Sequence, residues 1–181
     1  MGLHFPEDQW QNLEKKLESA LQDLPFNTVQ EMMTFLVSHP PRREHVEILA
    51  SHLTVGETFF FRDEKYFEAL QFQILPGLIR KRREEGNLFL RFWSAGCATG
   101  EEAYSLGMEF LEAIDARGAR LGLQIFATDV DPEAIGIARG AEYPLSIADQ
   151  VSPERLERFF QPLPGRGFRV RQPLRETVSF A

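Results

Sequence analysis

The chain has 181 residues, of which 43% are hydrophobic, so it can bury a core in one domain or in one domain with a small helical cap. Its 27 acidic and 20 basic side chains give a formal net charge of −7, which argues against nucleic-acid binding over the whole surface. A single cysteine excludes an internal disulfide, and no stretch approaches the ~20 apolar residues that span a bilayer, so we expect a cytoplasmic protein without membrane insertion.

The N-terminal part of the chain predicts a small group of amphipathic helices. Apolar residues recur at helical spacing over three ranges, 6 to 24, 28 to 38 and 42 to 53. Asp63 is then expected to cap a long helix from residue 64 to residue 84. Pro76 lies inside that pattern, which predicts a kink or two separate helices.

From Leu88 onward the pattern alternates between strand and helix, which is typical of a parallel sheet. Strands are predicted at 88–94, 122–128, 168–171 and 176–180, and helices at 100–115, at 132–139 and to residue 160 after Ser152-Pro153. Asp131-Pro132 and Ser152-Pro153 each read as a cap followed by proline in the first helical position. The predicted fold class is α/β, with an N-terminal helical domain over 1–55, a linker helix over 56–87 and a partial doubly wound, Rossmann-like domain over 88–181. That last domain is shorter than the ~100–150 residues usual for a domain, so we expect the chain to be the front part of a longer protein.

A turn of small residues follows the first strand, and two acids follow the turn. The segment Trp93-Ser94-Ala95-Gly96-Cys97-Ala98-Thr99-Gly100 leads into a helix that begins with Glu101-Glu102. Glycines allow a ligand to approach the backbone, but the spacing matches neither the dinucleotide nor the triphosphate motif. Two carboxylates would repel a pyrophosphate and attract a sulfonium or amino group. These properties favour S-adenosylmethionine as the cofactor, with an ordinary helix start as the alternative.

The roles of individual residues follow from this reading. Asp129 follows the second predicted strand, roughly where such folds place a carboxylate that binds ribose hydroxyls. We predict that Glu101 binds the methionine end of the cofactor and that Ala95 and Gly96 offer it backbone groups. The four histidines and the cysteine show no metal-binding spacing, so no metal site is expected.

Three segments together resemble the CheR-type chemotaxis receptor methyltransferases. They are Leu53 to Asp63 (LTVGETFFFRD), Trp93 to Glu102 (WSAGCATGEE) and Ala127 to Asp131 (ATDVD), and the resemblance covers roughly residues 48 to 181. It implies methyl transfer from S-adenosylmethionine to receptor glutamates, which yields methyl esters and S-adenosylhomocysteine. It also implies that the partner is a chemoreceptor or a receptor-like signalling protein.

The same resemblance places Thr58 against the cofactor and Arg62 near the methyl group, where it is our candidate catalytic residue. A buried acceptor carboxylate needs a cationic partner to stay ionised, and a guanidinium can hold one oxygen while the other attacks. An ion pair of Arg62 with Asp63 or Glu64 is the alternative role for this arginine.

Two departures from the family keep a second function open. Residues 1 to 50 contain four fixed positive charges, outnumbered by acids, where the family has an arginine-rich helix. The family's later Asn-Leu-Leu and Cys-Arg-Asn strands are also absent from the sequence. The alternative is a non-catalytic module that binds S-adenosylmethionine or docks a partner. A nicotinamide dehydrogenase fits poorly because the glycine pattern is wrong. The sequence does not predict an oligomeric state.

Overall fold

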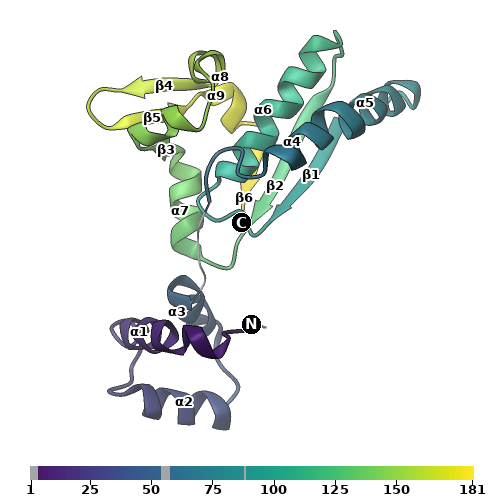
Figure 1. The fold of residues 1–181 in the computed structure, drawn as a ribbon. Coiled ribbons are helices and arrows are strands. Elements are labelled where there is room, and N and C mark those ends of the chain that lie inside the picture. Colours follow the sequence, from purple (N-terminus) through teal and green to yellow (C-terminus); the bar gives the residue numbers. More distant parts are fainter. Residues whose placement is uncertain (1–3, 54–57, 88) are drawn as a thin grey trace. The chain divides into compact units, whose positions relative to one another are not determined.

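The computed structural model describes residues 4–53, 58–87 and 89–181, and these divide into two compact units (Figure 1). One unit is Met1–Gly56 with Val130–Glu133, and the other is Glu57–Asp129 with Ala134–Ala181. In the described parts of the chain, no helix combines the length and apolar character needed to cross a membrane.

The first unit is a small helical group with its own core. Its elements are η1 (Glu7–Gln9), α1 (Trp10–Ala20), α2 (Val29–Ser38) and α3 (Arg43–Leu53). The first helix ends at Ala20, earlier than its apolar pattern predicts. Each helix turns an apolar face inward, because these short helices are stable only when packed together. The buried residues of this core are Ala20, Leu24, Met32 and Leu49.

The long helix predicted over 64–84 forms with an interruption. Asp63 caps α4 (Glu64–Ala69) by accepting a hydrogen bond from the Tyr66 backbone N–H at 3.2 Å. A π-helical stretch, η2 (Leu70–Ile74), separates α4 from α5 (Leu75–Glu84), and Pro76 lies in the first turn of α5. Proline has no backbone N–H, so the regular helical bonding pattern must shift just before it. The prediction of two helices at Pro76 is confirmed.

The main sheet has three parallel strands in the order β1 (Phe89–Ala95), β2 (Gly122–Thr128) and β6 (Val178–Phe180). Helix α6 (Glu101–Ala116) connects β1 to β2 and packs on one face, where the Phe92 and Phe110 rings stack with centroids 3.9 Å apart. On the opposite face Phe89, Trp93 and Phe126 are 52, 70 and 48% exposed. Within the described chain, the sheet is therefore helix-covered on one face, as in part of a Rossmann-like domain.

A second sheet was not foreseen from the sequence. The strand predicted over 168–171 exists as β5 (Gly167–Val170), but it pairs with β3 (Glu142–Tyr143) and β4 (Phe160–Leu163) in an antiparallel sheet. In Figure 1 the β4–β5 hairpin stands apart from the parallel sheet. The expectation that this strand continues the parallel sheet is wrong, because a turn as short as that between β4 and β5 can only join antiparallel strands.

The remaining connections contain short helices, two of which begin with a side-chain cap. These helices are α7 (Pro132–Gly140), η3 (Leu145–Asp149), α8 (Pro153–Phe159) and α9 (Gln172–Arg175). Asp131 caps α7 by accepting the Glu133 N–H, and Ser152 caps α8 by accepting the Arg155 N–H. Both caps precede a proline in the first helical position, as the sequence indicated.

Candidate functional site

The carboxyl ends of β1 and β2 are joined by backbone hydrogen bonds. The N–H groups of Gly96 and Cys97 donate to the Thr128 carbonyl oxygen at 2.7 and 3.0 Å. One residue on, the Ala98 N–H donates to Asp129 Oδ2 at 2.7 Å. The turn after β1 and the acid after β2 therefore lie together at the edge of the sheet where such folds bind nucleotides.

The two glycines of this turn have different roles. Both have positive φ angles, +77° at Gly96 and +94° at Gly100, a conformation that favours glycine. A Cβ atom on Gly96 would meet no atom within 4 Å, so the backbone there is open to an approaching ligand. A Cβ on Gly100 would lie 2.8 Å from Ala138 Cβ and 3.1 Å from the Tyr143 hydroxyl oxygen. Gly100 thus allows α6 to start directly against α7.

Glu101, the predicted partner of the methionine end, is half-buried in the first turn of α6. Its Oε2 accepts a hydrogen bond from Thr99 Oγ1 at 2.6 Å. Burial raises the pKa of this carboxyl, and the bond from Thr99 opposes that rise. The side chain of Glu101 is therefore held partly inside the protein by a neutral hydroxyl donor.

Glu102 is the exposed member of the pair, and nothing in the sequence favours it over Glu101. Its Oε1 accepts a hydrogen bond at 2.7 Å from Ser94 Oγ, which is buried near the end of β1. The pKa of Tyr66 on α4 is raised mainly by the burial of Tyr66 itself, and the nearby charge of Glu102 adds to that rise. Successive helix residues point about 100° apart, so sequence alone leaves open which of the two acids faces a ligand. The sequence feature that bears on this choice is Ser94 on the preceding strand, whose hydroxyl orients Glu102.

The segment that contains Thr58 and Arg62 is fastened to the same helix. The Phe61 N–H donates to Ser105 Oγ at 3.1 Å, and Ser105 Oγ donates to the Glu101 carbonyl oxygen at 2.7 Å. Phe61 has a φ of +57°, so the chain turns sharply there. These bonds bring the backbone next to Arg62 within one helical turn of Glu101.

The two predicted residues of that segment differ in exposure. Arg62 is exposed, with its guanidinium carbon 5.9 Å from the centroid of the Phe59 ring, and Thr58 is half-buried. Asp63, the alternative ionic partner of Arg62, caps α4.

Cys97 is buried, with 1% of its surface exposed. Burial, and then the nearby charge of Asp129, raises the pKa of its thiol to about 11. It is therefore a neutral thiol at pH 7 and no nucleophile, as expected of a small residue in a tight turn. Among the described residues, no three His, Cys, Asp or Glu side chains gather in a way that could hold a metal ion.

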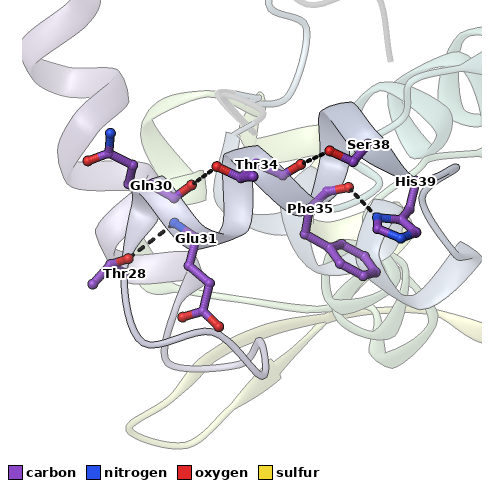
Figure 2. A pocket seen from close by; sticks show the side chains of 7 residues that line it. All are labelled: Thr28, Gln30, Glu31, Thr34, Phe35, Ser38 and His39. Carbon is purple, nitrogen blue, oxygen red and sulfur yellow. Dashed lines mark hydrogen bonds between the residues drawn. The ribbon is translucent and has the colours of Figure 1, made fainter.

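A hollow on α2 is a poor candidate for a ligand site (Figure 2). Its polar groups already bond within or next to the helix. Thr28 accepts the Glu31 N–H, and the hydroxyls of Thr34 and Ser38 donate to carbonyl oxygens one turn earlier. His39 Nδ1 lies 3.3 Å from the Phe35 carbonyl oxygen. A ligand would have to compete with these bonds.

The groups at the carboxyl edge of β1 and β2 fit S-adenosylmethionine. Residues 92 to 104 include two glutamates and no lysine or arginine, which disfavours a phosphate and favours a cationic ligand. Ala95 and Gly96 are exposed at the strand end, and Asp129 is half-buried beside them.

Known proteins agree with this chemistry. The family profile described as "CheR methyltransferase, SAM binding domain" matches residues 56–181. A chemotaxis protein methyltransferase of Borreliella burgdorferi is 28% identical over 179 residues, which cover 99% of this chain and 63% of the relative. Chemotaxis protein methyltransferase Cher2 of Pseudomonas putida is 31% identical over 183 residues, covering 99% and 65%.

A third relative matches a shorter stretch more closely. Chemotaxis protein methyltransferase 1 of Pseudomonas aeruginosa is 38% identical over 138 residues, which cover 74% of this chain and 49% of the relative. The chain therefore spans about half to two-thirds of the length of these three relatives. Since the profile matches most of the chain, the protein belongs to the CheR methyltransferase family, and its cofactor is S-adenosylmethionine.

Proposed function

We propose that the protein containing this chain transfers a methyl group from S-adenosylmethionine to glutamate side chains of chemoreceptors or receptor-like signalling proteins. The main support is the match to the S-adenosylmethionine-binding domain of the CheR family, and the relatives carry the name of chemotaxis protein methyltransferases. A cytoplasmic location is part of the proposal and is supported by the single, buried cysteine.

The residues at the carboxyl edge of β1 and β2 have proposed binding tasks. Asp129 accepts hydrogen bonds from the ribose hydroxyls, while its Oδ2 also keeps the Ala98 turn in place. Ala95 and Gly96 are exposed and present backbone groups, and a Cβ atom on Gly96 would meet no atom within 4 Å. Glu101 is our predicted partner for the amino group of the methionine end, and its neighbour Glu102 is a second candidate because it is exposed and oriented by Ser94.

The chemistry requires positioning more than proton transfer. When bound, the cofactor supplies an electrophilic methyl group on a sulfonium. The acceptor glutamate is already ionised at pH 7, so no base is needed. In agreement, burial raises the pKa of Cys97 to about 11 and that of Tyr104 to about 12, so neither group is a base at neutral pH. Arg62 is proposed to hold one acceptor oxygen while the other faces the methyl carbon at ~3–3.5 Å.

The test is a labelling experiment with the full-length protein. Receptor-containing membranes of the source organism are incubated with the protein and methyl-tritiated cofactor, and alkali is then used to release volatile label. Base-labile label on receptors is the expected result. Alkali-stable label would point to an amine or ring acceptor and contradict the proposal. Cofactor binding without any transfer would instead support the non-catalytic module.

Arg62→Ala is the variant that tests the catalytic assignment. We expect the rate of labelling to fall roughly a hundredfold, because the acceptor loses its orienting charge, while the Kd of the cofactor changes by less than about threefold. Arg62→Lys keeps the charge without the planar fork and should recover part of the rate. An equal loss of rate and cofactor affinity in Arg62→Ala would limit this residue to cofactor binding.

A further inference from the structure

A cavity of about 480 Å³ lies beside α6, away from the cofactor edge of the sheet. One wall is the Phe59–Phe61 segment with α4, and the facing wall is the chain from Asp149 to Arg155. Glu109 on α6 also lines it, and we call this space the acidic cavity. Its volume is in the range of small-ligand pockets. Glu109 is eight residues beyond Glu101, or ~12 Å along the helix, so the Glu109 end of the acidic cavity lies away from the first turn of α6, while its Phe59–Phe61 wall adjoins Thr58 and Arg62.

Glu109 is a buried acid with unused bonding capacity. The residue is 4% exposed, and its Oε1 pairs with Arg155 Nη2 at 2.6 Å. Its other oxygen, Oε2, is buried and has no hydrogen-bond partner among the described residues. Arg155 also binds Glu112, with Nη2 2.8 Å from Oε2, so one cation serves two carboxylates. A buried oxygen without a donor is costly, and a ligand N–H would remove that cost.

Three further acids line the acidic cavity. Glu64 and Glu68 are four residues apart and share one face of α4, and Asp149 comes from the opposite wall. All three are exposed. Arg155 is the single basic residue among the described residues that line the space. With Glu109, four acids thus face one base, and this excess of negative charge attracts a cation.

Aromatic rings supply the rest of the lining. Phe60 and Phe67 are buried, while Phe59 is 40% exposed. The guanidinium of Arg155 lies over the Phe61 ring, 4.3 Å from its centroid. The acidic cavity already holds one organic cation between a ring and carboxylates, which is a favourable arrangement for such a group. A metal ion would need several converging oxygen ligands in place of these rings.

We infer that the acidic cavity binds a positively charged group at the end of an aliphatic stem, such as a lysine or arginine side chain. The rings contact the stem, and the carboxylates of Glu64, Glu68 and Glu109 face the charge. The same chemistry is found in a side chain on a partner protein and in a free polyamine.

The test is titration calorimetry of the 181-residue chain at low ionic strength with Nα-acetyl-lysine methylamide. The matched ligand is Nα-acetyl-norleucine methylamide, which has the same four-carbon stem without the ammonium group. We expect saturable binding of the lysine compound and none of the norleucine compound. Equal binding of both would overturn the inference, as would no binding of either.

The protein variants separate a local site from general attraction to an acidic protein. Glu64→Gln/Glu68→Gln should weaken binding of the lysine compound roughly three- to tenfold. Glu14→Gln/Glu18→Gln makes the same change at the same spacing at two exposed positions of α1 and should leave the affinity unchanged. Melting curves of both double variants check that the fold is retained. An equal loss in the two would overturn the inference.

Two further experiments test the role of Glu109 and the identity of the ligand. Glu109→Gln keeps the shape of the side chain and should also lower affinity for the lysine compound, because the ligand loses the buried charge. An unchanged Kd in this variant would contradict the role of Glu109. Spermidine is titrated in place of the lysine compound to distinguish the two sources of the positively charged group. Tighter binding of spermidine would indicate that the ligand is a free polyamine, and weaker binding would indicate a side chain on a partner protein.

Discussion

Helix α6 holds acids in contrasting ways at its start and in its middle. In the first turn of α6, Glu101 and Glu102 receive hydrogen bonds from the neutral hydroxyls of Thr99 and Ser94. Two turns later, Glu109 and Glu112 share the guanidinium of Arg155. A hydroxyl orients a carboxylate and leaves its charge in place, whereas a guanidinium also neutralises it. The first turn therefore keeps a negative charge for a cationic ligand, whereas in the middle of the helix the shared guanidinium joins α6 to α8 and leaves Glu109 Oε2 without a donor among the described residues.

The largest expected effect comes from removing the guanidinium. Arg155→Ala should lower the free energy of unfolding by about 3–5 kcal/mol, because Glu109 is left buried without a cation. Denaturant unfolding of the 181-residue chain measures the loss. Adding Glu109→Gln to this variant should restore part of it, since a neutral amide costs less to bury. If the double variant is no more stable than Arg155→Ala, the stabilising role of the ion pair is refuted.

The start of α6 can be changed sterically. Gly100→Ala should lower the free energy of unfolding by about 2–4 kcal/mol, because the added methyl group meets Ala138 and the alanine must adopt an unfavourable positive φ. It should also lower the cofactor affinity of the full-length protein at least about tenfold. Gly118→Ala is the control, with a φ of +55° and no atom within 4 Å of the added Cβ. It should cost about 1–2 kcal/mol and leave cofactor binding intact. Similar effects of both changes on binding would refute the close packing of the turn.

The acid after β2 can be tested in two steps. Asp129→Ala should weaken cofactor binding in the full-length protein about ten- to a hundredfold, which corresponds to about 1.5–3 kcal/mol for a charged hydrogen-bond partner. Asp129→Asn retains an oxygen that can accept the Ala98 N–H, so the turn should stay in place. A loss of affinity in both variants supports a direct contact with the ribose. A loss in Asp129→Ala alone would restrict Asp129 to holding the turn.

The smallest effect concerns the pH dependence of stability. Because burial raises the pKa of Glu101 above its unfolded value, the folded wild-type protein is most favoured when this group is protonated. That contribution is present below the unfolded pKa and is lost as the pH rises through the folded one. Glu101→Gln should therefore be more stable than wild type at pH 7, and the difference should vanish as the pH falls below about 4. Thermal melts across this range measure it, and equal stability at pH 7 would contradict the assigned burial cost.

Glu101→Gln and Glu102→Gln together also identify the carboxylate that binds the cofactor. Each variant removes one charge from the first turn, but only the residue that contacts the methionine amino group should reduce cofactor affinity, by roughly tenfold. Equal, small losses in both would mean that the first turn attracts the cofactor only through its combined charge.

Local pattern was enough to predict most of the elements and the class of cofactor. Apolar periodicity located the helices and the three parallel strands, Asp63, Asp131 and Ser152 were recognisable as caps, and Pro76 indicated the interrupted helix. The glycine turn with two acids and no base excluded phosphates, and the CheR resemblance is confirmed by the family match. These signals depend on residues close together in the chain, so sequence alone carries them.

Tertiary structure decided what depends on distant residues. The strand at 168–171 has the alternation of any strand, and only its partners β3 and β4 put it in an antiparallel sheet. Which of two adjacent glutamates is exposed depends on Ser94 from another element, and the pairing of Glu109 with Arg155 crosses 46 positions of sequence. Burial, unpartnered oxygens and raised pKa values arise only when such segments pack together, because each depends on the surroundings of a group and not on its neighbours in the chain.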